Sequence, residues 1–210
     1  MAARRKNIQG EESRRRILDT ARAIAAERGY EATSIALVCE ACGLPASSIY
    51  WHFRDKDGLF AAIIEDSFAD WTEAMRLSPA RRKGETRQQF LERQLQLTGQ
   101  ALAASPDFLR LGLMLSLERR PTELTARKAF LRVRAKAIDN AADSYQTLFG
   151  IGRPHALALA RSVMIAADGI FIMREIEGPA FDVAEAFRLA AVSLVAVQKD
   201  LAKQTEPAQI

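Results

Sequence analysis

Residues 33–53 constrain the fold of this 210-residue chain more than any other segment. Two short stretches with apolar residues at helical spacing lie on either side of Gly43, and too few residues separate them for a loop. In the second stretch Ile49 and Phe53 are four residues apart and therefore share one helical face. This layout predicts two helices joined by a tight turn, a helix-turn-helix.

Residues at the ends of the two stretches support the same interpretation. Thr33 or Ser34 can cap the first helix, because a side-chain oxygen there can accept an N–H of the first turn. Gly43 can adopt the positive φ that a tight turn between helices requires. Pro45 suits the first position of the second helix, where its missing N–H is not needed.

The second helix leaves hydrogen-bonding side chains outside its apolar face: Ser47, Ser48, Tyr50, Trp51 and His52. Hydroxyl, indole and imidazole groups can all donate to phosphate oxygens. Since the second helix of a helix-turn-helix enters the DNA major groove, we expect this face to contact a duplex. The alternative is a buried helical hairpin with a few aromatic positions.

Further helices are expected on both sides of this segment. Upstream, a helix that starts at Arg14 has a regular apolar stripe and stops at Gly29. Downstream, Asp55 is a suitable N-cap for a helix whose apolar stripe continues to Trp71.

Together these segments resemble the TetR family of transcriptional regulators. Over roughly the first third of the chain, the resemblance is carried by Arg16-Ile17-Leu18, Ala21, Gly29-Tyr30, Thr33-Ser34-Ile35, Gly43-Leu44, Ile49-Tyr50, His52-Phe53, Lys56 and Leu59. It implies an all-α fold, with a three-helix DNA-binding domain over residues 1–58 and a larger helical domain over 59–210 that binds an effector and dimerises. It also implies that Lys56 contacts a DNA phosphate.

The recognition face departs from the family pattern, because it has no Arg, Lys, Asn or Gln to make bidentate contacts with bases. We therefore expect little direct base readout and a larger role for DNA shape. Arg4, Arg5 and Lys6 form either a flexible basic arm that reaches DNA or a solvated tail. The expected DNA contacts are Thr33, Ser34, Ala46, Ser47, Ser48, Tyr50, Trp51, His52, Lys56, Arg4, Arg5 and Lys6.

Composition is compatible with this interpretation without requiring it. The formal net charge is +4, and 49% of the residues are hydrophobic, enough for a substantial core. The N-terminus is basic but lacks the apolar region of a signal peptide. The most apolar window, residues 156–173, contains Arg161 and Asp168 and is not expected to span a membrane. We expect a soluble cytoplasmic protein.

Cys39 and Cys42 are spaced C-x-x-C, but no second pair accompanies them and the only histidines are His52 and His155. We expect packed thiols and no metal or cofactor, with a thiol-sensing role left open. The sequence also lacks a phosphate-binding loop and a nucleophile motif, so a regulator is expected and not an enzyme.

Beyond residue 72, helical periodicity broken by proline and glycine predicts a loop and five more helices. The loop covers 76–84, and the helices cover about 85–104, 105–118, 121–149, 154–177 and 182–202. The last two are apolar on more than one face, which favours pairing with a symmetry mate in a four-helix bundle. A two-fold dimer would place two recognition helices roughly 34–36 Å apart on a palindromic operator. The expected interface residues are Val163, Ala167, Ile170, Phe187, Leu194 and Val195.

The C-terminal helices could also enclose an effector, although aromatic residues at helical spacing more often only fill a core. Asp168 could pair at the dimer interface or orient an effector. Effector-released repression, activation, and regulation without a small molecule all stay open. The expected lining residues are Phe68, Trp71, Phe90, Phe108, Met114, Leu117, Phe130, Tyr145, Met164, Asp168 and Phe171.

Overall fold

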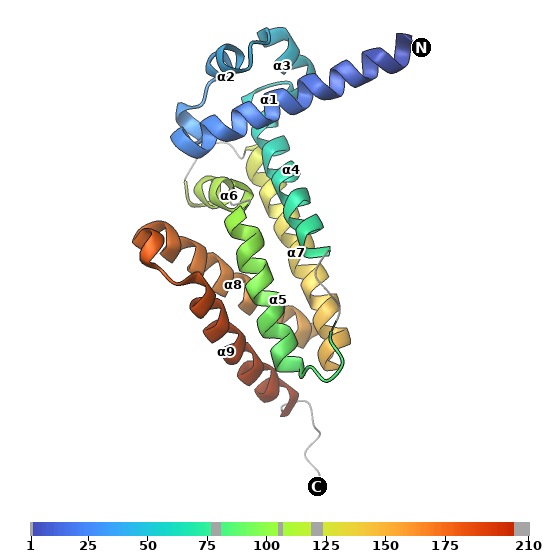
Figure 1. Cartoon of the computed structure of the whole chain (residues 1–210), viewed down its shortest axis with the longest axis vertical. Helices are drawn as coiled ribbons and strands as arrows, with labels where there is room; N and C mark the ends of the chain where they lie inside the picture. The colour runs from blue at the N-terminus through green and yellow to red at the C-terminus, as the bar shows by residue number, and fades with distance from the viewer. Residues whose placement is uncertain (1, 77–80, 105–106, 119–123, 204–210) are drawn as a thin grey trace. The chain divides into compact units, whose positions relative to one another are not determined.

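The computed structural model describes residues 2–76, 81–104, 107–118 and 124–203. Over these ranges the regular elements are helices and no strand occurs, which confirms the all-α prediction (Figure 1). The elements are α1 (Ala2–Ala32), α2 (Ile35–Cys42), α3 (Ala46–Phe53), α4 (Lys56–Arg76), α5 (Arg87–Ala104), α6 (Asp107–Leu117), α7 (Thr125–Phe149), α8 (Arg153–Glu177), the 3₁₀ turn η1 (Gly178–Ala180) and α9 (Val183–Lys203).

The chain forms two compact units that are not consecutive in sequence. Unit 1 combines Met1–Asp70 with Ser105–Val133, and unit 2 combines Trp71–Ala104 with Arg134–Ile210. The first three helices therefore share a unit with α6 and the first part of α7. A functional domain boundary after residue 58 stays a prediction.

Helix α1 corrects the expected start of the first helix. It begins at Ala2, so the segment that holds Arg4, Arg5 and Lys6 is helical and is not a flexible arm. Ala, Arg and Lys are strong helix formers, and no proline interrupts them. The predicted stop at Gly29 is confirmed as a break, since this residue has φ 74° and ψ −179°.

The core of unit 1 is built from the apolar faces of its helices. Tyr30 and Phe60 meet edge to face, with ring centroids 4.5 Å apart. Gly112 allows α6 and α7 to approach closely, because a Cβ there would lie 2.0 Å from the Phe130 ring. The core side chains include Ile17, Leu18, Val38, Ile49, Leu59, Phe60, Ile63, Ile64, Leu109 and Leu111.

Helix α4 caps two other helices of unit 1. The Asp57 carboxylate accepts the backbone N–H groups of Thr125 at 2.6 Å and Ala126 at 3.0 Å, at the start of α7. The buried Ser67 hydroxyl accepts the N–H of Phe108 at 3.3 Å, at the start of α6. These bonds satisfy N–H groups that have no partner within their own helices.

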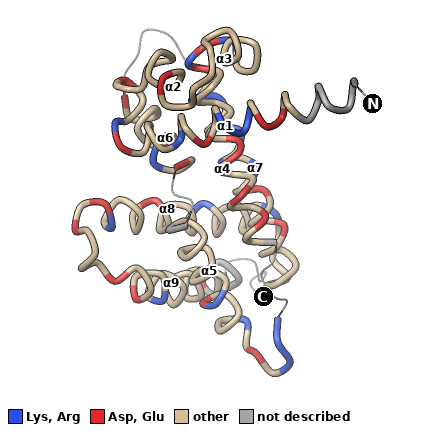
Figure 2. The backbone as a smooth tube through the Cα atoms, turned by 45° about the horizontal axis from the view of Figure 1, so that its top comes forward, with Lys and Arg blue, Asp and Glu red and all other residues tan. Residues whose placement is uncertain are grey.

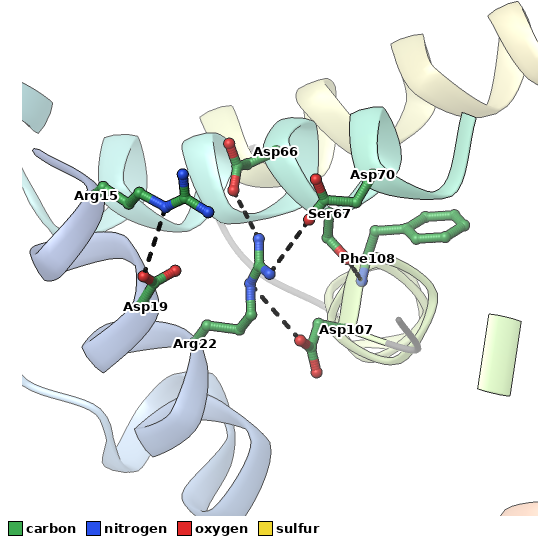
Figure 3. Close-up of polar contacts among 8 residues, drawn as sticks. All are labelled: Arg15, Asp19, Arg22, Asp66, Ser67, Asp70, Asp107 and Phe108. Atoms are coloured by element: carbon green, nitrogen blue, oxygen red, sulfur yellow. Dashed lines mark hydrogen bonds and ion pairs between the residues drawn. The ribbon is translucent and has the colours of Figure 1, made fainter. Parts of the chain in front are cut away.

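Arg22 of α1 ties α1 to α4 and α6 (Figure 3). Its guanidinium lies 2.7 Å from the Asp66 carboxylate, 3.4 Å from Asp70 and 3.7 Å from Asp107. Burial raises the pKa of Asp107, and the nearby Arg22 and Arg110 charges oppose that rise. This charge cluster fixes the first helix against the helices that follow the helix-turn-helix.

Unit 2 packs α9 against α5 and α8. Gly99 of α5 faces Phe187 of α9, where a Cβ would lie 2.5 Å from the ring. By length and composition alone, Arg153–Ala180 is apolar enough to cross a membrane. However, Asp168 in this stretch forms a bidentate ion pair with Arg134 of α7, at 2.7 and 2.5 Å. The charge that interrupts the apolar run is therefore paired within the chain.

The remaining helix ends follow the sequence closely. The predicted loop at 76–84 is confirmed where it is described, since α4 ends at Arg76 and α5 begins at Arg87. Asp182 caps α9 by accepting the N–H of Glu185 at 3.0 Å. The expected helix starts at Ser105-Pro106 and Pro121-Thr122 lie outside the described residues.

Candidate nucleic-acid interface

The segment α2–turn–α3 has the geometry that its end residues predict. Ser34 is the N-cap of α2 and accepts the N–H of Leu37 at 3.1 Å. Gly43 has φ 64° and ψ 26°, and its N–H donates to the carbonyl of Cys39 at 2.9 Å. Pro45 lies one position earlier than expected, at the N-cap of α3, where its carbonyl accepts the N–H of Ser48. The missing proline N–H is equally harmless there.

Helix α3 has a sharply divided surface. Ile49 and Phe53 are buried, as their spacing predicted. On the opposite faces Tyr50 is 52% and Trp51 77% exposed. Ala46 and Ser47 are also exposed, and Ser48 and His52 are half-buried. An exposed tryptophan beside a tyrosine and a histidine marks a surface that is suited to a partner.

Thr33, one of the expected DNA contacts, is buried and is not exposed to a partner. Its side chain is 1% exposed, and its hydroxyl donates to the carbonyl of Gly29 at 2.7 Å. That carbonyl is available because the backbone leaves the helical conformation at Gly29. Thr33 therefore fixes the turn before α2, while the neighbouring Ser34 is exposed.

Lys56 connects the start of α4 to the end of α1. Its ammonium donates to the carbonyl of Glu31 at 3.2 Å and lies 4.3 Å from the centroid of the Tyr30 ring. These contacts hold the side chain in place beside the helix-turn-helix. An ammonium has three donors, so a phosphate contact by Lys56 stays a prediction.

Two α1 arginines that were not among the expected contacts lie near the ends of α3. The Arg14 guanidinium lies 5.5 Å from the Phe53 ring centroid, at the end of α3. A guanidinium nitrogen of Arg16 lies 3.4 Å from the position that a Cβ on Gly43 would occupy. The sequence signal that could have indicated them is the basic run Arg14-Arg15-Arg16 at the expected start of the first helix.

His52 lies in a positive environment. Burial lowers its pKa, Arg14 lowers it further, and Glu11 opposes the shift. Its ring also packs edge to face on Trp51, with centroids 4.5 Å apart. The imidazole therefore favours its neutral form until an anion approaches.

The junction of α3 and α4 is unusually tight. Arg54 has φ 70° and ψ −49°, and the N–H of Asp55 donates to the carbonyl of Phe53 at 2.8 Å, which closes a three-residue γ-turn. A Cβ on Gly58 would lie 2.1 Å from the carbonyl oxygen of Phe53. Asp55 accepts the N–H of Gly58 at 2.7 Å, as expected of an N-cap.

The cysteine pair is packed beside the turn. Cys42 is buried and Cys39 half-buried, both are free thiols, and burial raises the pKa of Cys39. The Cys42 thiol donates to the carbonyl of Cys39 at 3.8 Å. Over the described ranges, no group of three or more His, Cys, Asp or Glu side chains could hold a metal ion.

The expected effector-lining residues belong to both compact units. Phe68, Phe108, Met114, Leu117 and Phe130 lie in unit 1, where Met114 and Leu117 are exposed. The Phe68 and Phe108 rings pack edge to face, with centroids 5.6 Å apart, as core residues do. The other expected lining residues lie in unit 2: Trp71, Phe90, Tyr145, Met164, Asp168 and Phe171. An effector site stays a prediction.

Most of the residues expected at the dimer interface are buried within the chain. Ala167, Phe187, Leu194 and Val195 are buried within the chain, and Val163 and Ile170 are half-buried. These residues lie on faces of α8 and α9 that pack inside the chain. The exposed apolar side chains of the two helices lie on other faces. The exposed set on the two helices is Ile165, Ile172, Met173, Ile176, Leu189, Val192 and Val197.

The glycine turn, the buried face of α2 and α3, and the exposed polar and aromatic face of α3 define a helix-turn-helix protein. Residues 17–63 match the family model described as bacterial regulatory proteins, tetR family. Over this segment the chain is similar to the TetR family of regulators.

Similar proteins agree with this assignment. The HTH-type transcriptional regulator AcrR of Shigella flexneri is 38% identical over 63 residues, which are 30% of this chain and 29% of that relative. The match therefore spans less than a third of the relative's length. A putative transcriptional regulator from Pseudomonas aeruginosa PAO1 superposes with a TM-score of 0.72 at 14% identity, over 93% of this chain and 95% of the other. The multidrug binding protein EbrR, complexed with imidazole, gives 0.63 at 20% identity over 87% and 89%. At these identities the structural likeness concerns the fold.

Proposed function

We propose that this protein is a sequence-specific DNA-binding transcriptional regulator and not an enzyme, with α3 as its recognition helix. The observation that carries the proposal is the divided surface of α3, where Trp51 and Tyr50 are exposed opposite the buried Ile49 and Phe53. A helix of this kind after a glycine turn fits the major groove. The match of residues 17–63 to the tetR family model supports the same function.

The proposed contacts divide by chemistry. Ser34, Ser48, Tyr50, His52 and Lys56 supply donors for phosphates. Ala46, Ser47 and Trp51 are left for base edges, with apolar contact to thymine methyl groups. Arg14 and Arg16 add cations near the two ends of α3, and the helical segment at Arg4, Arg5 and Lys6 stays a proposed contact.

Selection of bound fragments from random duplex DNA, followed by titration of the best fragment, tests this function. The variant Trp51→Ala/Tyr50→Phe should weaken that complex by at least about tenfold, because a base contact and a phosphate donor are lost. Leu131→Ala is the matched control, since Leu131 is an exposed apolar side chain on α7. Equal affinity of the two variants would contradict the proposal, and so would the absence of any selected fragment.

We propose further that the protein acts as a homodimer through the exposed apolar side chains of α8 and α9. Ile165 and Ile176 are 72% and 71% exposed, although both lie on apolar helices. A second copy of the same surface would cover them and present two α3 helices to a palindromic operator.

The proposed mode of action is repression that a small-molecule effector releases, in a cytoplasmic protein. The fold is shared with a protein described as multidrug binding. An effector would act only through different affinities for the DNA-bound and free states. Thermal-shift screening distinguishes this mechanism from constitutive or partner-controlled regulation, because only an effector would both stabilise the protein and weaken operator binding. A reporter gene behind the selected operator separates repression from activation.

A further inference from the structure

A second cluster of cations lies in unit 2, in the turn that leads into α5. Arg81, Arg82, Lys83 and Arg87 fall within seven residues, and all four are exposed. The first three form a run of blue in the turn before α5 (Figure 2). None of the four has an ion pair within the described part of the chain.

This lack of ion pairs sets the turn apart from other arginines on the surface. Several arginines elsewhere hold a carboxylate at 2.6–4.0 Å. The pairs are Arg15–Asp19, Arg132–Glu65, Arg153–Asp139 and Arg188–Glu185. The cations of the turn therefore present a net positive charge.

The single acidic residue of the turn, Glu85, is paired mainly with Arg93 of α5. Glu85 accepts two hydrogen bonds from the Arg93 guanidinium, at 2.8 and 2.9 Å, and one from the backbone N–H of Arg82 at 2.8 Å. These bonds, led by those of Arg93, lower the pKa of Glu85 to about 2. The Glu85 charge is thus offset mainly by Arg93, with a smaller contribution from Arg82, and the turn keeps a net positive charge.

The same bonds hold the turn in a defined shape. The N–H of Glu85 donates to the carbonyl of Arg82 at 3.1 Å, and Gly84 supplies the positive φ of 82°. Thr86 and Gln89 form a reciprocal capping box at the start of α5, with bonds of 2.9 and 3.1 Å. A pre-organised set of cations loses less entropy on binding than a flexible tail does.

The side chains of the turn favour one kind of anionic partner over others. Residues 81–89 contain no apolar or aromatic side chain, and the Arg93 guanidinium covers the following Phe90 ring at 5.2 Å. A protein interface needs such anchors, and attachment to a membrane surface is much strengthened by them. Duplex DNA binds through phosphate charge alone, with one charge per about 1.7 Å of helix axis.

We propose that the turn at residues 81–87 is a second DNA contact, made to backbone phosphates without regard to sequence and separate from α3. The turn would bind any duplex by charge alone, whereas α3 is proposed to select a sequence. Since the turn needs no operator, the proposal does not depend on sequence-specific recognition by α3.

The test compares two charge-neutralising double variants of the full chain. Arg81→Gln/Lys83→Gln removes two cations of the turn. The control Lys136→Gln/Arg161→Gln removes two exposed cations elsewhere in unit 2 that also have no ion pair within the described ranges. Both are made in a Trp51→Ala/His52→Gln background, so that contacts by α3 do not dominate.

Binding of a random duplex is measured over a range of KCl concentrations. The turn variant should lower the slope of log affinity against log salt by about 1.8, at about 0.9 per phosphate contact, while the control leaves it unchanged. Equal slopes for the two double variants overturn the proposal. Loss of binding to vesicles containing anionic lipid, with duplex binding unchanged, overturns it in favour of a membrane contact. If the background variant still binds the selected operator fully, the function proposed for α3 fails, whatever the turn does.

Discussion

At the scale of single residues, Gly58 at the start of α4 has no room for a side chain. A Cβ there would lie 2.1 Å from the backbone oxygen of Phe53, which cannot rotate away. Gly58→Ala should therefore lower the free energy of unfolding by about 1–3 kcal/mol, as overpacking does. Urea denaturation measures this change.

Gly10 provides the control for this substitution, because it lies in α1 with open space around its Cβ position. Gly10→Ala should raise stability by about 0.5–1 kcal/mol, as expected of a helix interior. Equal effects of the two substitutions would mean that the tight contact at Gly58 does not exist in solution.

We expect His52 to make DNA binding sensitive to pH. Burial and Arg14 hold its pKa below the usual value in the free protein, and a DNA phosphate would raise it. A proton is then taken up on binding, so affinity should rise as pH falls between the bound and free pKa values, by up to about tenfold per pH unit. Titrations of operator DNA from pH 8 to pH 5.5 measure the effect. His52→Gln should flatten the profile, and an unchanged slope in that variant would assign the pH effect to other groups.

The sequence predicted local features of single residues better than contacts between distant ones. The αL turn at Gly43 and the caps at Ser34 and Asp55 depend on neighbouring residues, and all three are confirmed. The burial of Thr33 was not foreseen, because a threonine can cap a helix from outside or donate backwards to a carbonyl. Nor does helical spacing reveal that Asp168 pairs with Arg134, which is 34 residues away.

At the scale of helices, α4 determines how two others begin. Asp57 accepts two N–H groups at the start of α7, and they would lose a charged acceptor in Asp57→Ala. This variant should cost about 0.5–2 kcal/mol of stability, as the loss of a cap does. It should also speed hydrogen exchange in the first turn of α7. Glu27→Gln, at an exposed acidic residue of α1, is the control. Unchanged exchange in α7 would show that Asp57 is not its cap.

Helix ends were predictable where a proline, glycine or cap marked them, as at Gly29 and Asp182. The start of α1 was not, because no breaker lies between Ala2 and Arg14 except Gly10, which the helix tolerates. The sequence of α8 has apolar residues on several faces. It does not indicate which of these faces packs against other helices of the same chain. That choice depends on packing against α9, so four of the six expected interface residues are buried within the chain.

At the scale of the whole molecule, we expect the exposed apolar side chains of α8 and α9 to govern assembly. Ile165→Glu and Ile176→Glu should each raise the dimer dissociation constant by at least about tenfold, because burying an unpaired carboxylate is costly. Light scattering after size exclusion, over a range of concentrations, measures the shift. Leu131→Glu, on an exposed apolar residue of α7, should leave it unchanged. A stable dimer in both isoleucine variants would place the interface elsewhere.

The capping role of α4 also limits how genes for such proteins can change in length. Asp57 and Ser67 lie on one helix and serve two different helices, α7 and α6. Inserting one residue between them would rotate one side chain by about 100° relative to the other and shift it by about 1.5 Å. Both caps could not then be kept, so descendants of this gene should carry substitutions between codons 58 and 66 but neither insertions nor deletions.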